Sequence, residues 1–353
     1  MKTTIKLLSL ILALVTIAAL FASCAVKTTS SSEGDTDTDT DTDLPLDTLV
    51  LKIGDFEIDY EYYRYFFLTC KRSMENGDAE FFKKNPEKLE DLKADVLNEL
   101  KYEASVISLA NKYGVSVSDE DYLEIDSMIA YYDSMYKASY DMSFEEYAAM
   151  YYMTLNFYRE FYAYNNCLSA YVYEHIADPA NNLVPTPTQE DLDNAMNGYV
   201  RVKHILVSEP TEEEGEEEGT SDEKTGLELA EWICSELSAV TDYDARLERF
   251  NELEALYNED EGMDDELGYY MTTGQMVEEF EKAAFSLEVG EVSKPTKSTY
   301  GYHVIFRLKP DNAYVEENMY PYYAANKIIL ENEETLTVTE TDFYKNITID
   351  SIK

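Results

Sequence analysis

The feature of this sequence that most constrains its fold is a series of short motifs between residues 200 and 305. Apolar and polar residues alternate from Val200 to Val207, which predicts a strand, and this strand contains His204. Farther along, Tyr300–Ile305 contains His303, so two of the three histidines of the chain lie in these motifs. The motifs between them are Leu267–Tyr270, Gly274–Phe285 and Val289–Pro295. A single histidine in a strand is usually a hydrogen-bonded core residue and does not indicate a functional site by itself. A functional role for these two histidines is therefore inferred from the order of all the motifs together.

In this order the motifs closely resemble the parvulin family of prolyl isomerases, and the resemblance covers nearly all of residues 199–309. It implies a small antiparallel sheet flanked by helices, with His204 on the first strand and His303 on the last. In parvulins these two histidines share a hydrogen-bond network below the active site, so the role implied for them is structural and catalytic. The family's Cys-or-Asp position aligns with Asp260, and Glu259 or Glu261 are alternatives because this loop varies in length.

The resemblance also implies a substrate-binding wall. Leu267, Met276 and Phe280 match the apolar residues that receive the proline ring. Ser298 matches a hydroxyl position beside the site, and Tyr300 lines the same edge.

The implied reaction is rotation about an X–Pro peptide bond. The barrier is about 18–20 kcal/mol because the planar amide has partial double-bond character, and the uncatalysed event takes tens of seconds or more. An apolar pocket favours the twisted transition state, which carries less separated charge, while Asp260 or Ser298 tunes the carbonyl oxygen. The reaction needs no metal and no cofactor. Asp264-Asp265-Glu266 replaces the family's usual Gly-Gly-Asp, which leaves open whether the activity is retained.

The N-terminus predicts secretion and a lipid anchor. Lys2 and Lys6 precede a largely apolar run, Leu7–Phe21, which is short for a membrane span and typical of a signal peptide at residues 1–23. Cys24 follows small residues and resembles the lipidated cysteine of a bacterial lipobox, although Phe21 replaces the common Leu. Acyl chains on Cys24 would hold the protein at the outer face of the cell membrane. The alternative is an ordinary signal peptide with an incidental cysteine.

Charge and composition limit the partners. The chain has 72 acidic and 28 basic residues, a net charge of −44, which excludes nucleic acid binding because phosphate contacts require Lys and Arg. Residues 24–47 include an Asp-Thr repeat without apolar periodicity, and we expect a disordered, self-repelling spacer.

Residues 48–198 are expected to form a mainly helical, chaperone-like domain. A short strand at Leu49–Ile53 precedes a helix capped by Asp59, a second helix with Asn85 as its cap, and a long helical segment from the capping box at Ser143 to about Ile176. The many Tyr and Met residues have two interpretations, a helical core or an adaptable surface that holds peptides.

The C-terminal segment, residues 310–353, is expected to pack back against the helical domain. Helical spacing extends over Tyr314–Asn332, and Leu336–Val338 and Ile347–Ile352 have extended patterns. The expected fold class is therefore α+β, a helical region with a parvulin domain inserted before a C-terminal tail. In this architecture the chain looks like the PrsA-type extracytoplasmic foldases and, more distantly, the SurA-type periplasmic chaperones.

The expected function is that of a membrane-anchored foldase that binds unfolded secreted polypeptides and isomerises their X–Pro bonds. One alternative is a chaperone with an inactive parvulin domain. Another is a lipid-anchored solute-binding protein, which predicts alternating strands and helices through residues 48–198. The loop at residues 209–223 has nine acids and no Lys or Arg, so we expect it to disfavour phosphorylated substrates or to be a solvated charge run.

Overall fold

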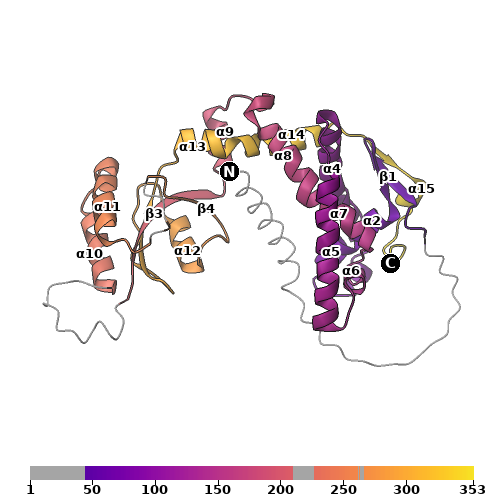
Figure 1. The fold of residues 1–353 in the computed structure, drawn as a ribbon, viewed down its shortest axis with the longest axis horizontal. Coiled ribbons are helices and arrows are strands. Elements are labelled where there is room, and N and C mark those ends of the chain that lie inside the picture. The colour runs from indigo at the N-terminus through magenta and orange to yellow at the C-terminus, as the bar shows by residue number, and fades with distance from the viewer. Residues whose placement is uncertain (1–43, 210–225, 261, 263–265) are drawn as a thin grey trace. The chain divides into compact units, whose positions relative to one another are not determined.

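The computed structural model describes residues 44–209, 226–260, 262 and 266–353, which form two compact units (Figure 1). Unit 1 extends to Pro185 and resumes at Ala324, and unit 2 is Thr186–Tyr323. The signal peptide predicted at residues 1–23, Cys24, the spacer up to residue 43, residues 210–223 of the acidic loop, Glu261, and Asp264 and Asp265 lie outside the described residues.

Unit 1 contains a three-stranded antiparallel sheet in the order β2–β1–β7. Its strands are β1 (Leu49–Ile53), β2 (Phe56–Asp59) and β7 (Val338–Glu340). Because β7 comes from the far end of the chain, the C-terminal segment completes the sheet that the first strand begins. The strand predicted at Leu49–Ile53 is confirmed, whereas the C-terminal strand begins at Val338, and residues 347–352 form turns and irregular structure.

The remainder of unit 1 is helical. Its helices are α2 (Tyr60–Glu75), α3 (Phe81–Lys84), α4 (Lys88–Tyr113), α5 (Asp119–Tyr140), α6 (Phe144–Ala149), α7 (Leu155–Ala163), the π-helix η1 (Tyr164–Leu168), α8 (Ser169–Ala177), η2 (Pro179–Asn181), α14 (Tyr320–Glu333), whose first residues belong to unit 2, and α15 (Asp342–Lys345). The regular elements between residues 60 and 195 are all helices. The alternative hypothesis of a solute-binding protein predicted alternating strands and helices in this region, and the structure does not show them.

Two sequence-based helix boundaries are wrong. Asn85 follows α3 instead of capping α4, whose N-cap is Glu87. The long segment predicted after Ser143 is divided, because α6 ends at Ala149 and the chain passes through a left-handed residue, Tyr152 at φ 66°, before α7. The Ser143 capping box is present at the start of α6.

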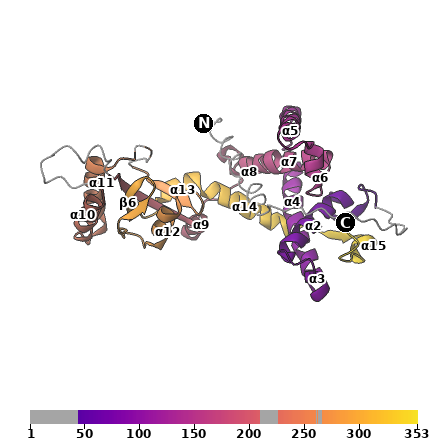
Figure 2. The same ribbon diagram turned by 90° about the horizontal axis from the view of Figure 1, so that it is seen from below.

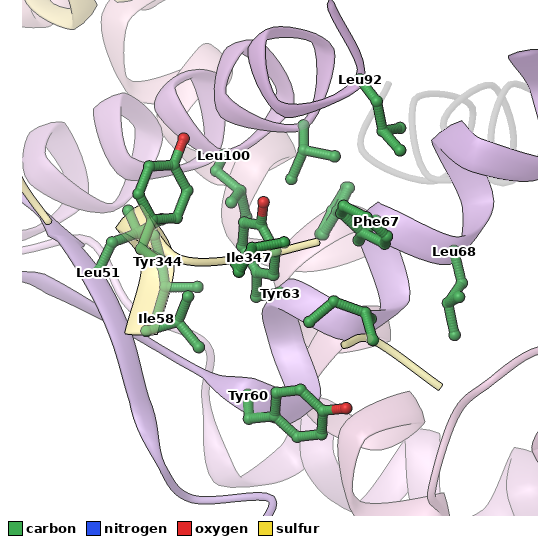
Figure 3. Packing of buried hydrophobic residues seen from close by; sticks show 14 of the residues in the cluster. Leu51, Ile58, Tyr60, Tyr63, Phe67, Leu68, Leu92, Leu100, Tyr344 and Ile347 are labelled. Atoms are coloured by element: carbon green, nitrogen blue, oxygen red, sulfur yellow. The ribbon is translucent and has the colours of Figure 1, made fainter. Parts of the chain in front are cut away.

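One apolar core joins the sheet of unit 1 to α2, α4 and α15 (Figure 3). Tyr63 and Phe67 of α2 are fully buried in it, and the rings of Tyr63 and Tyr344 meet edge to face with centroids 5.7 Å apart. Leu92 and Leu100 pack from α4. Burying each such side chain contributes about 1.5–3 kcal/mol, so the core fixes the C-terminal segment to α2 and α4.

A second core attaches α14 to α4 and α8 within unit 1. Ala325 and Ile329 of α14 are fully buried against Val106 and Val172. Ser105 Oγ donates to the carbonyl oxygen of Ile329 at 2.6 Å in the same contact.

Unit 2 contains a four-stranded antiparallel sheet in the order β4–β3–β6–β5. Its strands are β3 (Tyr199–Val207), β4 (Tyr269–Thr272), β5 (Thr296–Ser298) and β6 (Gly301–Arg307). Its helices are α9 (Gln189–Ala195), α10 (Gly226–Ser238), α11 (Tyr243–Tyr257), α12 (Glu278–Ser286) and α13 (Asn312–Asn318). Helices α9 and α13 therefore lie in unit 2, beyond the predicted limits of 199–309.

Helices cover both faces of this sheet, with α10 and α11 on one side and α12 on the other (Figure 2). Successive side chains of β3 point to opposite faces of the sheet. Ile205 and Val207 therefore pack against α10 and α11, whereas Val200 and Val202 pack against α12. In the described part of the chain, none of the helices combines the length and the apolar character that a membrane crossing requires.

Candidate active site

The pleat of β3 and β6 brings the two predicted histidines together on the face of the sheet that α12 covers. The strand register places His303 opposite Leu206, two residues from His204, so the rings meet diagonally across the two strands. Their Nδ1 atoms lie 3.1 Å apart, and both side chains are buried.

Asp260 reaches this pair from the loop after α11. Its Oδ2 lies 2.9 Å from His204 Nε2. Asn258 holds the loop, because its Oδ1 accepts from the backbone N–H groups of Leu206 and Asp260 while its Nδ2 donates to the Asp260 carbonyl at 2.8 Å. Glu259, an alternative in the sequence alignment, instead accepts from the Ser208 N–H at 3.2 Å. Of the two acidic residues described in this loop, Glu259 and Asp260, it is Asp260 that contacts a histidine.

Ser298 and Tyr269 extend the contacts at the two ends. Ser298 Oγ on β5 lies 2.7 Å from His303 Nε2. Tyr269 on β4 donates its hydroxyl to Asp260 Oδ2 at 3.0 Å, and its ring stacks beside His204. Sequence reasoning did not assign Tyr269 to the site, although it lies within the Leu267–Tyr270 motif. Two residues before Met271 on β4, it faces the same side of the sheet as Met271, which packs against α12.

These five side chains form a continuous hydrogen-bonded row, Tyr269–Asp260–His204–His303–Ser298, in which the protons can be assigned. An ionised Asp260 only accepts, so neutral His204 donates through Nε2 and accepts at Nδ1. His303 therefore carries its proton on Nδ1 and accepts at Nε2 from the Ser298 hydroxyl. Each member fixes the orientation of the next.

Burial supports this protonation pattern. Desolvation lowers the pKa of His204, against the opposing effect of Asp260, and desolvation with the neighbouring His204 lowers the pKa of His303 to about 4. Burial acts to raise the pKa of Asp260, but hydrogen bonds from Gly262 N–H, His204 and Tyr269 outweigh it, so this pKa lies below its ordinary value. Burial, together with the bond to Asp260, raises the pKa of Tyr269 to about 12. Near neutral pH the row holds two neutral rings and one carboxylate.

An apolar wall from α12 and the preceding turn adjoins the row. The Phe280 ring lies nearly perpendicular to both imidazoles, with ring centroids 5.1 Å from His204 and 5.2 Å from His303. Phe280 is buried, whereas Met276 is half-buried and packs against the same apolar cluster. The predicted wall residues Met276 and Phe280 are therefore brought together.

The structure does not group the remaining predicted residues, Leu267 and Tyr300, with the apolar cluster of Met276 and Phe280. Tyr300 is exposed, and its backbone N–H donates to Ser298 Oγ at 3.1 Å. Leu267 is half-buried, and its carbonyl oxygen accepts from Arg201 Nε at 2.9 Å. Gly268 then allows β4 to pass close to β3, because a Cβ at this position would lie 2.5 Å from the Val202 carbonyl oxygen.

Comparison with known proteins places this segment in a family. Residues 190–309 match the family model of the PPIC-type PPIase domain, which spans every residue of the row. Foldase protein PrsA 4 of Bacillus cereus is 31% identical over 170 residues, which cover 48% of this chain and 50% of that protein. This segment is a parvulin domain, and the chain is PrsA-like.

Other comparisons cover either a larger part of the chain or a separate parvulin. Foldase protein PrsA of Staphylococcus aureus is 28% identical over 247 residues, covering 69% of this chain and 68% of that protein. Among solved structures, PrsA from Bacillus subtilis is 20% identical and covers 82% of this chain and 92% of its own, at a TM-score of 0.26. The parvulin NmPin of Nitrosopumilus maritimus is 32% identical and covers 32% of this chain and 97% of its own, at a TM-score of 0.22. The chain spans about half the length of the B. cereus relative that it matches.

The parvulin domain combines a rigid polar row with an adjoining apolar wall. Within the described residues, no group of three or more His, Cys, Asp and Glu side chains is arranged to hold a metal ion. Cys234 on α10 is not an activated thiol, because burial raises its pKa to about 12. Its groups are suited to binding and orienting a substrate whose bonds rotate.

Proposed function

We propose that the chain is an extracytoplasmic foldase that binds unfolded secreted polypeptides and catalyses cis–trans isomerisation of their X–Pro bonds. The observation that carries this proposal is the row Tyr269–Asp260–His204–His303–Ser298 beside the wall of Met276 and Phe280. The match of residues 190–309 to the PPIC-type PPIase domain supports the same reaction.

In the proposed mechanism, Leu267, Met276 and Phe280 receive the proline ring, and Tyr300 lines the entrance. The twisted amide has lost its resonance and carries less separated charge than the planar amide, so an apolar surface that excludes water binds it better. Asp260 and Ser298 set the polarity beside the substrate carbonyl. The neutral histidines keep both of these groups in place and act as positioning residues.

The substrates we propose are neutral or basic around the proline. Lys297 on β5 is the cation nearest to Ser298 in sequence, and its ammonium is already paired with Glu209 at 2.6 Å. The acidic loop that begins at Glu209 adds negative charge, which opposes a phosphate group on the substrate.

We further propose that residues 1–23 are a signal peptide and that lipid on Cys24 anchors the protein to the membrane. The acidic spacer would then separate unit 1, as the holding domain, from the lipid surface. In the alternative, the altered residues 264–266 abolish isomerisation and the chain only holds its clients. The parvulin wall favours the isomerase, because Met276 and Phe280 are both in place.

The test is an isomerisation assay of the purified full chain on neutral X–Pro peptides, with and without phosphoserine before the proline. We expect acceleration that Met276→Ala abolishes and Asp260→Ala lowers, while Met150→Ala, a matched change at an exposed methionine of unit 1, leaves it unchanged. Faster turnover of the phosphorylated peptide would contradict the proposed substrate class. A folded chain that suppresses client aggregation without any acceleration would establish the holding function alone.

A further inference from the structure

Six tyrosines form one connected surface on α5, α6 and the turn after α6. We call this the tyrosine surface, and its members are Tyr131, Tyr132, Tyr136, Tyr140, Tyr147 and Tyr151. Phe144 contacts both Tyr132 and Tyr136 and so connects the rings of the group. The centroids are 4.3 Å apart for Tyr136 and Tyr147 and 5.2 Å apart for Tyr147 and Tyr151. The spacing of Tyr132, Tyr136 and Tyr140 by four residues places them on one face of α5.

The tyrosine surface lies outside the cores of unit 1. Phe144 beneath it is buried, and the ring of Tyr132 packs on Phe144 at 5.4 Å. By contrast, Tyr131 is 64% exposed, Tyr140 is 67% exposed and the nearby Met150 is 58% exposed. Aromatic faces that are held in place and open to solvent cost little conformational entropy when a ligand covers them.

The charges around this surface are almost all negative. Residues 119–163, which include α5, α6 and α7, contain ten acids and two bases, Lys137 and Arg159. Both bases are already paired, Lys137 with Asp133 at 2.7 Å and Arg159 with Asp126 at 2.6 Å. Asp141 and Glu145, which flank Phe144, are exposed and form no ion pair with a described residue. The surface therefore presents aromatic faces beside unneutralised carboxylates.

The same helices show how such a surface accommodates a cation. The guanidinium of Arg159 lies 4.3 Å from the centre of the Tyr122 ring, and its Nε and Nη2 bind the two carboxylate oxygens of Asp126 at 2.6 and 3.2 Å. A ring face and a neighbouring carboxylate thus hold one guanidinium together. The tyrosine surface offers the same two kinds of group, tyrosine rings and carboxylates.

We propose that the tyrosine surface binds extended polypeptide segments that carry arginine or lysine. This inference rests on the proposed holding function and specifies its substrate class as cationic segments of unfolded chains. Charge complementarity favours this occupant, since cations are attracted both to the ring faces and to carboxylates such as Asp141 and Glu145. A second copy of the chain is disfavoured, because its own net charge is −44.

The test uses the full chain and a fluorescent, proline-free peptide with several arginines, so that the parvulin site is not engaged. A matched peptide carries citrulline, the neutral counterpart, at each arginine. Binding is measured by anisotropy at low and high salt, and oligomeric state by light scattering. Two double variants are compared with the wild type. The tyrosine variant combines Tyr131→Ala with Tyr140→Ala, and the acid variant combines Asp141→Asn with Glu145→Gln. Tyr322→Ala is the control, because Tyr322 is exposed and lies in unit 2.

We expect the arginine peptide to bind about ten-fold more tightly than the citrulline peptide, with a loss of similar size in the tyrosine variant. The acid variant should weaken binding and reduce its salt dependence. Isomerase activity, measured on the same samples, should remain unchanged in every variant, which separates this inference from the reaction of unit 2.

Three results would overturn the inference in different ways. Equal affinity for the two peptides would remove the preference for cations and leave the holding function intact. No binding of either peptide by an active isomerase would remove the holding function as well. A change of oligomeric state in the tyrosine variant would show that a second copy covers the surface.

Discussion

The Nδ1 atoms of His204 and His303 lie 3.1 Å apart, so the Nδ1–H of His303 donates to the unprotonated Nδ1 of His204, and a second proton on His204 would break this contact. The contact joins the carboxylate of Asp260 to the hydroxyl of Ser298 through two neutral rings. Protonation of His204 therefore interrupts the row at its centre, and protonation of His303 at Nε2 removes the acceptor of the Ser298 hydroxyl.

The first prediction concerns acid stability. The pKa values of both rings are lowered, that of His303 to about 4, whereas unfolded histidine titrates near 6.5. Between these values the unfolded chain binds more protons, so the stability of unit 2 is complete above about pH 6.5 and declines as the pH falls toward 4. Urea unfolding at pH 7.5 and pH 5.5, followed by Trp232, the one tryptophan of the chain, measures this decline.

The matched variants for this experiment are His303→Gln and His175→Gln. His303→Gln should lose part of the decline, because the glutamine does not titrate. His175 lies on α8 in unit 1 and should leave the pH dependence of unit 2 unaltered. An unaltered decline in His303→Gln would mean that His303 is not held neutral in the folded protein.

The second prediction concerns Tyr269, the member of the row that sequence reasoning missed. Tyr269→Phe removes the hydrogen bond to Asp260 and should destabilise unit 2 by about 0.5–1.5 kcal/mol. It should also slow isomerisation, because Asp260 is then held by fewer donors. Tyr322→Phe is the control for loss of a hydroxyl at an exposed position. Unchanged stability and activity in Tyr269→Phe would exclude it from the functional row.

The third prediction compares two glycines with positive φ. Gly268 has φ 68° and Gly274 has φ 86°, but a Cβ would lie 2.5 Å from the Val202 carbonyl oxygen at Gly268 and meets nothing within 4 Å at Gly274. Gly274→Ala should cost about 1 kcal/mol from its backbone conformation, and Gly268→Ala several kcal/mol because β4 must move away from β3. Equal costs in chemical denaturation would show that the strands do not approach this closely.

The fourth prediction concerns Glu103, a carboxyl buried in unit 1 that accepts from the Tyr62 hydroxyl. Burial raises the pKa of Glu103 to about 8, above the ordinary value near 4.5, so the folded chain binds more protons than the unfolded chain between these values. The stability of unit 1 should therefore fall as the pH rises from about 4.5 to 8. Glu103→Gln should weaken this fall and be more stable than the wild type at pH 8.5, as measured by loss of helical circular dichroism. The same slope in both proteins would contradict a buried, protonated Glu103.

The sequence predicted the parts of the site that follow from local pattern. Motif order carried the resemblance to the parvulin family, and this resemblance implied that His204 and His303 share a hydrogen-bond network and that Phe280 belongs to the apolar wall. The structure brings these three side chains together. The sequence alignment favoured Asp260 but left Glu259 and Glu261 as alternatives, because the hydrogen bonds from Asn258 that hold the loop backbone are not visible in the sequence. Tyr269 was missed because its phenol reaches from β4 to Asp260 in the loop after α11, and a contact between a strand and a loop leaves no periodic pattern in the sequence.

In unit 1 the sequence predicted helices more reliably than their limits. The capping box at Ser143 was recognised, and α6 begins there. The break before α7 was not, because tyrosines occur on nearly every face of this segment and hide the helical period. The break depends on the left-handed conformation of Tyr152, which its residue type does not favour.

The most direct test of the account is exchange NMR of a neutral X–Pro peptide with the full chain, observed together with the imidazole signals of His204 and His303. The account predicts faster cis–trans exchange, saturable shifts of both imidazole signals as the peptide binds, and loss of both effects in Met276→Ala. Exchange at the uncatalysed rate while the peptide shifts these signals would contradict isomerisation at this site, and exchange enhanced equally in Met276→Ala would place the activity elsewhere.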